Sequence, residues 1–488
     1  VDEDQVTIES TSSELVVDTG TENDVVDVRT IGAKTTLNLG EDADRVVVSS
    51  TAPTPGGIVA GIAAELIVNG GLGGDTLVVD NAGDSGANTG SLTNTHVMGL
   101  EMASGIAYDS IEMLDILLGD LVDNFTIVTT FDNTITTLNS GDGADIIDIE
   151  AVNGPTFVDS GDGADVVNVT PSASGPVNSR SPRPLLPSAI NARLTLDGGG
   201  APGDVDTFTF TTIHTSAQPG TLTATELTGL QMPLGIGYKN FEALDILTLI
   251  DGVEFTIEST HAGTTRLATD SVACDSTAPE YNLSPYDLDS SACRFSFPDP
   301  LIEDSENFKC PRGGTLTEDS IPNTTTPDPD DAIVFDRYCI LDLGNDNADT
   351  ITVLSTGGET EIWTDRGADT INVRTVGGAT TVRAGDGDDT VNVGSNAPST
   401  LGTLDTISAL LTVEGDDGDD TLNVDDTGDP TTDTGSLTST TIRGLGMSDG
   451  IDYGTFETLN IALSAESDLF DVISTHGGVT NITSRAGG

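Results

Sequence analysis

Residues 367–393 read GADTINVRTVGGATTVRAGDGDDTVNV. Two short runs of the form Asp-x-apolar-x-apolar begin at Asp369 and Asp389, twenty residues apart, and a glycine-containing turn precedes each run. Side chains two residues apart lie on the same face of a β-strand. The apolar Val391 is therefore expected on one face and the polar Thr390 on the other. The stretch predicts a repeating unit of strand, turn, strand, turn.

This spacing recurs along the chain. Strand-initiating aspartates lie twenty residues apart in three groups, and the interval then lengthens to 31 residues from Asp44 to Asp75 and from Asp389 to Asp420. A second marker, present as GLEMASGIAY, GLQMPLGIGY and GLGMSDGIDY, confirms a longer period of about 120–130 residues. The three groups are Asp4, Asp24 and Asp44; Asp145 and Asp165; and Asp349, Asp369 and Asp389.

A strand–turn unit of this length cannot bury its apolar face alone, whereas stacked copies bury a continuous core. Glycine, threonine and valine are poor helix formers. The sequence therefore predicts an all-β parallel β-helix or β-roll solenoid with about 20 residues per coil and three larger repeats. Neither end shows a polar cap, so we expect adjoining coils. The predicted parts are solenoid repeat 1 (1–144), solenoid repeat 2 (145–269), a cysteine-containing insertion (270–338) and solenoid repeat 3 (339–488).

The charge of the chain restricts its partners. It has 80 acidic and 17 basic residues, a formal net charge of −63. Nucleic acids and anionic membrane surfaces bind through clustered Lys and Arg, so we expect neither partner. An apolar run of about 18 residues, which a spanning helix needs, does not occur, so we expect no membrane insertion. The acidity favours cations, and carbohydrate or protein partners bridged by cations.

The four cysteines, Cys274, Cys293, Cys310 and Cys339, all lie in or next to the predicted insertion. They form no C-x-x-C pair and have no histidine among them, which favours two disulfides over a zinc site. Disulfides imply an oxidising compartment, so we expect a secreted or cell-surface protein. Sequons for N-glycosylation agree with secretion, although some arise by chance in a threonine-rich chain. They lie at Asn124, Asn168, Asn282, Asn323 and Asn481.

Stacking would place aspartates twenty residues apart in columns with a spacing of about 4.8 Å. At an effective dielectric constant of about 20, each neighbouring pair would cost about 3–4 kcal/mol. Solvent exposure, raised pKa values or bound cations must offset this cost. Oxygen ligands on glycine-bearing turns suit calcium, and a solvated acidic face with loosely held counter-ions is the alternative. The candidate calcium ligands are Asp24, Asp42, Asp44, Asp75, Asp142, Asp145, Asp162, Asp165, Asp346, Asp349, Asp365, Asp369, Asp386, Asp388, Asp389, Asp416 and Asp420.

Four turns share the pattern Gly-x-Gly-x-Asp-x-apolar, with the aspartate at Asp75, Asp145, Asp165 or Asp389. They resemble the GGxGxDxUx repeats of RTX calcium-binding β-solenoids, found in large extracellular adhesin and filament proteins. Similar repeat-built filaments include the flagellar hairs (mastigonemes) of algae. The resemblance implies calcium held by aspartate and backbone carbonyl oxygens. The period here is twenty residues with one motif per coil, so the ligand geometry of the RTX repeat is not implied.

These features predict a non-catalytic extracellular structural repeat protein, an acidic calcium-stabilised building block of a filament or cell-surface assembly. Its expected partners are copies of itself or adjoining repeats of a longer chain, and glycans. The alternative is a calcium-dependent adhesin or a carbohydrate-binding surface protein. A polysaccharide-active β-helix enzyme is disfavoured, because catalysis needs one distinctive constellation and these aspartates are copied from unit to unit. We therefore expect no enzymatic activity.

Overall fold

A computed structural model divides the chain into two compact units, which are described separately. Unit 1 comprises Val1–Thr269 and Asn347–Gly488, and unit 2 comprises Asp270–Asp346. The described residues contain no α-helix, and hence no helix that could cross a membrane. The structure describes residues 3–171, 189–200, 203–214, 219–250, 252, 254–269, 348–364 and 366–484, together with the backbone of four short strands between 288 and 340.

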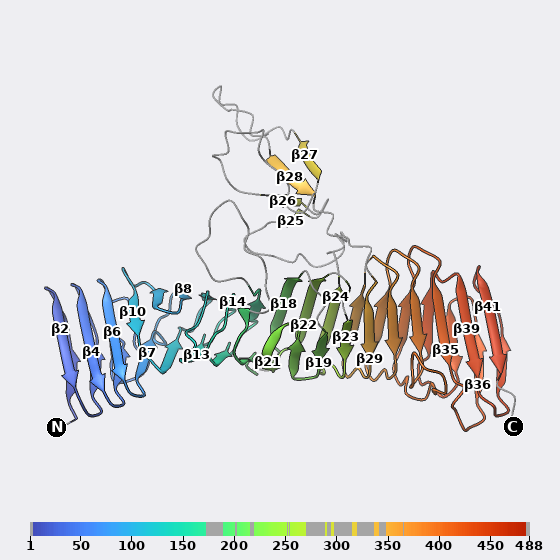
Figure 1. Ribbon diagram of the computed structural model, residues 1–488, viewed down its shortest axis with the longest axis horizontal. Coiled ribbons are helices and arrows are strands. Elements are labelled where there is room, and N and C mark those ends of the chain that lie inside the picture. The colour runs from blue at the N-terminus through green and yellow to red at the C-terminus, as the bar shows by residue number, and fades with distance from the viewer. Residues whose placement is uncertain are drawn as a thin grey trace. The chain divides into compact units, whose positions relative to one another are not determined.

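Unit 1 is built from two long sheets, and the chain passes from one sheet to the other as it advances (Figure 1). The strands of the first sheet follow one another mostly in parallel. In order of pairing they are β1 (Gln5–Ile8), β3 (Val25–Val28), β5 (Arg45–Val48), β7 (Thr76–Asp80), β11 (Met113–Leu117), β13 (Ile135–Asn139), β15 (Thr156–Asp159), β17 (Leu194–Asp197), β21 (Met232–Lys239), β20 (Glu226–Gly229), β19 (Gly220–Leu222), β23 (Glu254–Ile257), β29 (Thr350–Val353), β31 (Thr370–Val373), β33 (Thr390–Val393), β35 (Thr421–Asp425), β39 (Thr458–Leu463) and β41 (Val479–Ser484).

The second sheet has the same organisation, and together the two sheets confirm the predicted parallel β-solenoid. Its strands, again in order of pairing, are β2 (Leu15–Gly20), β4 (Thr35–Glu41), β6 (Leu66–Leu72), β10 (Ile106–Asp109), β9 (His96–Gly99), β8 (Thr89–Leu92), β12 (Asn124–Ile127), β14 (Ile146–Ile149), β16 (Val166–Val169), β18 (Thr207–His214), β22 (Ala243–Ile250), β24 (Thr264–Thr269), β30 (Thr360–Trp363), β32 (Thr380–Arg383), β34 (Leu411–Glu414), β38 (Ile451–Gly454), β37 (Thr441–Gly444), β36 (Thr434–Leu437) and β40 (Leu469–Val472).

The register of the strands confirms the coil of twenty residues. Thr350 pairs with Thr370, and Thr370 pairs with Thr390, in three successive strands of the first sheet. The next step is 31 residues, yet the register is kept because Thr390 pairs with Thr421. The additional residues form the connection between β33 and β34, outside the sheets. Insertions therefore lengthen connections without shifting the strands.

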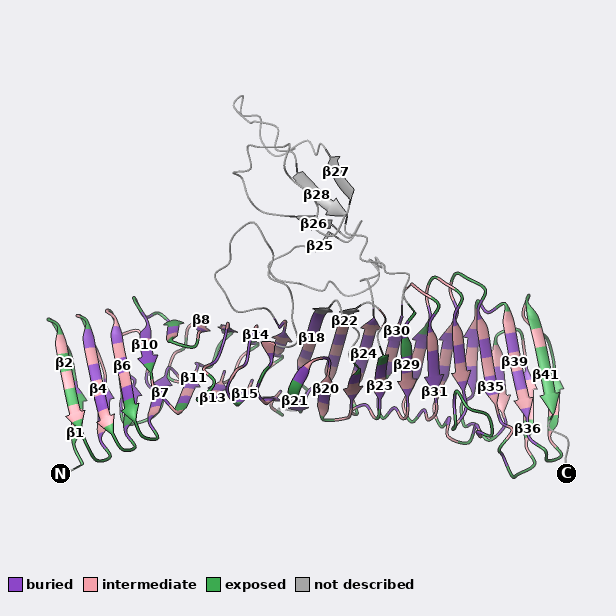
Figure 2. Ribbon diagram, in the orientation of Figure 1, coloured by how far each residue is buried: buried purple, intermediate pink, exposed green. Residues whose placement is uncertain are grey.

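The core of unit 1 lies between the two sheets. Burial alternates along the strands, as Figure 2 shows, with Val391 and Val393 buried and the side chains between them partly exposed. Most buried apolar side chains contact one another in one large cluster that extends from Ile8 to Leu463, and Val47, Ala52 and Val78 form a second, small cluster. Each coil thus covers the apolar face of its neighbour, as the sequence period predicts.

Three antiparallel meanders interrupt the alternation between sheets. β8–β9–β10 and β36–β37–β38 lie in the second sheet, and β19–β20–β21 lies in the first. The repeated Gly-Leu-x-Met marker belongs to these meanders, and its tyrosine has the same role in each. The hydroxyl groups of Tyr108, Tyr238 and Tyr453 donate to the backbone carbonyls of Thr93, Thr223 and Thr438, at 2.6, 2.5 and 2.7 Å.

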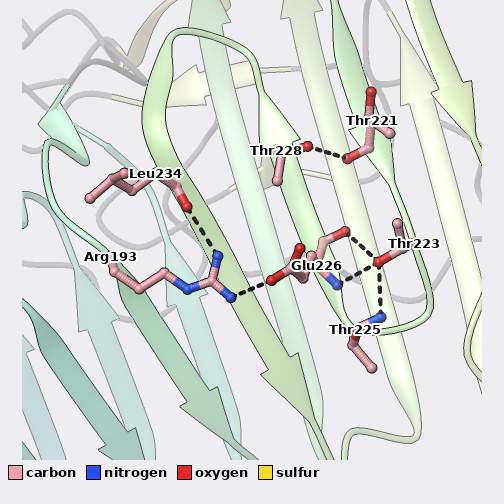
Figure 3. A network of polar contacts seen from close by, with 7 residues as sticks. All are labelled: Arg193, Thr221, Thr223, Thr225, Glu226, Thr228 and Leu234. Atoms are coloured by element: carbon pink, nitrogen blue, oxygen red, sulfur yellow. Dashed lines mark hydrogen bonds and ion pairs between the residues drawn. The ribbon is translucent and has the colours of Figure 1, made fainter.

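Figure 3 shows the second meander. The guanidinium of Arg193, in β17, donates to the Leu234 carbonyl oxygen at 3.0 Å and to Glu226 Oε1 at 2.6 Å. The Thr223 hydroxyl accepts hydrogen bonds from the backbone N–H groups of Thr225 and Glu226 at 3.3 and 3.0 Å, which closes the turn between β19 and β20. The Arg193 side chain of the preceding coil therefore holds the meander against the stack.

Unit 2 contains an antiparallel four-stranded sheet in the order β25–β26–β28–β27. It spans 270–346, against 270–338 for the predicted insertion. Cys274, Cys293 and Cys310 lie outside the described residues, and of Cys339 only the backbone, in β28, is described. The two disulfides therefore stay a prediction. The strands are β25 (Leu288–Asp289), β26 (Arg294–Ser296), β27 (Thr315–Asp319) and β28 (Asp336–Ile340).

The second glycine of the Gly-x-Gly-x-Asp turns is required by the stacking of backbones. Gly387 has a φ of +138°, and a Cβ atom on it would lie 1.6 Å from the carbonyl oxygen of Gly367 one coil earlier. Gly163 would place a Cβ 1.3 Å from the oxygen of Gly143 in the same way. Neighbouring turns approach too closely for any side chain at this position. Stacking therefore explains the second glycine of the pattern.

We predict that Gly387→Ala lowers the unfolding free energy by more than about 2 kcal/mol, because it combines an unfavourable φ with a backbone clash. Gly477→Ala is the control, since a Cβ there would have no heavy atom within 4 Å. Thermal and urea unfolding measure both variants. Equal stability of the two alanine variants would contradict the stacking explanation.

Candidate functional site

The strand-initiating residues form three long hydrogen-bonded ladders, and one further step of the same kind joins the backbone N–H of Asp433 to Asp468 Oδ1 at 3.0 Å. In each ladder the backbone N–H of one residue donates to the side-chain carboxylate of the equivalent residue in the next coil. Asp349 N donates to Asp369 Oδ1, and Asp369 N donates to Asp389 Oδ1, both at 2.7 Å. The rungs are Asp4, Asp24, Asp44, Asp75 and Glu112 in the first ladder; Asn88, Asp123, Asp145, Asp165, Asp206 and Glu242 in the second; and Asp349, Asp369, Asp389, Asp420 and Glu457 in the third.

The position of each rung explains its role. Every rung immediately precedes a strand, and the carboxylate of each rung after the first accepts the N–H of the residue that precedes the paired strand one coil earlier. The first and third ladders run along the first sheet, and the second ladder runs along the second sheet. The ladders change from one sheet to the other at the meanders. Each meander adds strands to one of the two sheets, so the next ladder aspartate precedes a strand of the other sheet.

The structure divides the predicted calcium ligands into two sets, apart from Asp346 and Asp365, which lie outside the described residues. The larger set belongs to the ladders and is buried. The smaller set lies in the turns and is exposed or, for Asp416, partly exposed. The ladder set is Asp24, Asp44, Asp75, Asp145, Asp165, Asp349, Asp369, Asp389 and Asp420; the turn set is Asp42, Asp142, Asp162, Asp386, Asp388 and Asp416.

Because the ladder aspartates are buried, solvent exposure cannot offset the repulsion between their carboxylates. Asp389 is only 1% exposed, and its Oδ1 is used by the N–H of Asp369. The second carboxylate oxygen, Oδ2, is buried with no hydrogen-bond partner in Asp389, and the same holds for other rungs. A buried, unpartnered carboxylate oxygen is costly unless it is protonated or bound by a cation. These rungs are Asp24, Asp44, Asp75, Asp145, Asp165, Asp369, Asp389 and Asp420.

Burial raises the pKa of several ladder carboxyls and so shifts them toward the protonated form. Burial raises the pKa of Asp369 to about 8, opposed by the N–H bond from Asp349 and supported by the charges of Asp349 and Asp389. Burial likewise raises the pKa of Asp389 to about 7. A proton shared along the ladder would lower the repulsion between rungs. Burial raises the pKa to about 6 at Asp75, Asp165, Asp206 and Asp420.

The turn aspartates stack more loosely than the rungs. The backbones of Asp142 and Asp162 pair as an isolated parallel bridge, as do those of Asp386 and Asp417. Arg366 precedes Asp386 in the same column and forms an ion pair with it at 3.7 Å. Among the described residues, no three of the predicted ligands bring carboxylate oxygens within 4.8 Å of one another. A cation at these turns would therefore need backbone carbonyl oxygens and water as further ligands.

Three of the five sequons lie in described residues. Asn124 and Asn481 are exposed, and Asn168 is partly exposed, with Nδ2 donating to Asp148 Oδ1 at 3.0 Å. Asn282 and Asn323 lie outside the described residues. Glycosylation stays a prediction at all five positions.

Sequence reasoning missed the last rung of each ladder, because that rung is a glutamate rather than an aspartate. Glu112 Oε2 accepts the N–H of Asp75 at 2.8 Å, 37 residues away. The available signal was the shared sequence after the tyrosine marker, where Glu112, Glu242 and Glu457 occupy matching positions. Sequence reasoning also missed a cluster of three carboxylates, Asp426, Asp429 and Asp433.

No protein-family model matches this chain, and neither does any curated protein. The chemistry of the ladders and the repetition of the fold are therefore the basis for a functional proposal.

We predict that Asp145→Ala destabilises unit 1 by about 1–3 kcal/mol, because it leaves the buried N–H of Asp123 without an acceptor. Asp142→Ala, in the exposed part of the same turn, is the matched control and should have little effect. Urea unfolding at pH 5 measures the difference under conditions that favour the protonated rungs. A loss of stability that is equal in both variants would reject the ladder as a structural element.

The raised pKa values also predict a pH dependence. The folded chain binds protons at Asp369 and Asp389 up to about pH 8 and 7, whereas an unfolded chain releases them near the usual 3.8. Because the folded state holds more protons in this interval, its stability falls as the pH rises. In the presence of a chelator, the thermal midpoint should therefore fall between pH 5 and pH 8. A midpoint that rises over this interval would contradict the assignment.

Proposed function

We propose that this chain is a non-catalytic structural segment of an extracellular filament or cell-surface assembly, stabilised by calcium along its acidic turns. The observation that carries this proposal is that the same ladder occurs three times along one continuous core. Repetition of one element in successive coils suits a scaffold, because each coil needs only its neighbours for stability. An active site, by contrast, needs residues that differ from their copies.

Calcium enters the proposal through the charge of the chain. A net charge of −63 acts against the compact state by self-repulsion. Hard cations with oxygen ligands relieve this repulsion at carboxylates and backbone carbonyls. The stacked turns that contain Asp142 and Asp162 offer both kinds of oxygen in neighbouring coils.

The proposed location and assembly are tested by immunogold electron microscopy on the source cells with antibodies against unit 1. The expected result is label on surface structures or on extracellular fibres. Purified chain examined by negative-stain electron microscopy provides the second measurement, and end-to-end association is expected. Label confined to the cell interior would refute the extracellular proposal.

The calcium part of the proposal predicts a higher thermal midpoint with calcium than with a chelator at pH 7.5, because bound cations replace the repulsion between carboxylates. Magnesium at the same ionic strength is the control for non-specific screening. A midpoint that does not differ between calcium and chelator would reject calcium stabilisation and leave the structural role untouched.

A further inference from the structure

A cluster of three carboxylates lies in the connection between β35 and β36. Asp426, Asp429 and Asp433 each offer a carboxylate oxygen, and these three oxygens all lie within 4.8 Å of one another. Ligands on opposite sides of a calcium ion, each about 2.4 Å from it, are separated by about 4.8 Å. The three oxygens are therefore close enough to share one ion. We call these residues the repeat-3 cluster.

Burial makes this cluster different from an ordinary acidic surface. Asp426 is fully buried and Asp429 is 4% exposed. The Oδ2 atoms of both residues are buried with no hydrogen-bond partner. No Lys or Arg among the described residues forms an ion pair with any of the three carboxylates. Two buried carboxylate oxygens without a hydrogen-bond partner at one point call for a proton or a positive ligand.

The other carboxylate oxygens hold the cluster in place. Asp426 Oδ1 accepts the backbone N–H of Leu404 at 3.0 Å, and Asp429 Oδ1 accepts the N–H of Thr431 at 2.7 Å. The Thr431 hydroxyl oxygen lies 2.8 Å from Asp429 Oδ1 and 3.1 Å from Asp433 Oδ2, and its one proton is donated to either carboxylate. The orientation of the Asp426 and Asp429 carboxylates is therefore set by the backbone before any ion binds, which lowers the ordering cost of binding.

The first repeat supplies an internal comparison, because Asn81, Asp84 and Asn88 occupy the matching positions. Asn81 Oδ1 accepts the N–H of Val59 at 2.9 Å, and Asp84 Oδ1 accepts the N–H of Gly86 at 2.7 Å. These bonds reproduce those of Asp426 and Asp429 on the same scaffold. We call these three residues the repeat-1 counterpart.

The two sites differ in charge rather than in backbone. In the repeat-1 counterpart, Asn81 Nδ2 donates to Asp84 Oδ2 at 3.4 Å, so an amide supplies the positive partner of that carboxylate oxygen. In the repeat-3 cluster the equivalent residue is Asp426, which has no such donor. A cation in the repeat-3 cluster would take the place of the amide hydrogens.

We propose that Asp426, Asp429 and Asp433 form a binding site for one divalent cation, with calcium as the ion that best fits three carboxylates on a loop. Water and backbone or hydroxyl oxygens complete the coordination. The site lies outside the Gly-x-Gly-x-Asp turns, so it deepens the proposed calcium dependence but does not depend on it.

The test is calcium titration of the full-length chain by isothermal calorimetry at physiological salt, after removal of metal by a chelator. Asp426→Asn combined with Asp433→Asn gives the repeat-3 cluster the residues of its counterpart, and one calcium ion fewer should bind per chain. The reverse variant, Asn81→Asp with Asn88→Asp, should bind one ion more. Asp84→Asn is the control and should bind as the wild type does.

Circular dichroism establishes that each variant is folded. If the folded Asp426→Asn/Asp433→Asn chain binds as many ions as the wild type, the site is refuted, and shared protons neutralise the cluster instead. If the reverse variant gains no ion, the assignment of the ligands to these three positions is refuted. A midpoint that rises with calcium equally in the wild type and in the Asp426→Asn/Asp433→Asn variant would overturn this site alone and leave calcium at the turns in place.

Discussion

The hydrogen bond from the backbone N–H of one ladder residue to the carboxylate of the next fixes each coil on its neighbour. It forms across separations that range from 20 to 41 residues. The bond constrains only the residue before each strand, so the chain between two rungs can lengthen without changing the register. This is why connections of very different length coexist with sheets in which Thr350, Thr370, Thr390 and Thr421 stay aligned.

The same bond has an electrostatic cost, since it requires carboxylates to be buried one above another. The N–H donors favour the ionised form, whereas burial and neighbouring charges disfavour it and prevail at Asp369 and Asp389. Each ladder ends in a glutamate, and Glu242 and Glu457 are exposed where the aspartates are buried. The longer side chain lets the final carboxylate reach the N–H of the preceding rung while it remains in contact with solvent. The ladder therefore ends where its charge can be hydrated.

The sequence was sufficient for the period, the parallel solenoid and the alignment of the aspartates, because each depends on local spacing that repeats. The sequence was not sufficient to predict which groups the aspartates contact. A column of carboxylates is compatible with outward-facing turns and with buried rungs, and only the backbone positions distinguish them. The antiparallel meanders were also missed, although the marker around Tyr108 indicated that something recurs there. Strand direction within a short connection depends on turn geometry that the apolar pattern does not encode.

A comparison of the three repeats distinguishes acidic residues that the fold requires from acidic residues that it does not require. Each ladder position that accepts a backbone N–H from the preceding coil carries an acidic side chain, and this contact explains why, since the N–H would otherwise be buried without a partner. Asp426 and Asp433 behave differently, because asparagine occupies both positions in the first repeat on a scaffold with the same backbone bonds. Folding therefore does not require a carboxylate there. A charge that the scaffold does not need, placed where burial makes it costly, is best explained by a ligand that neutralises it.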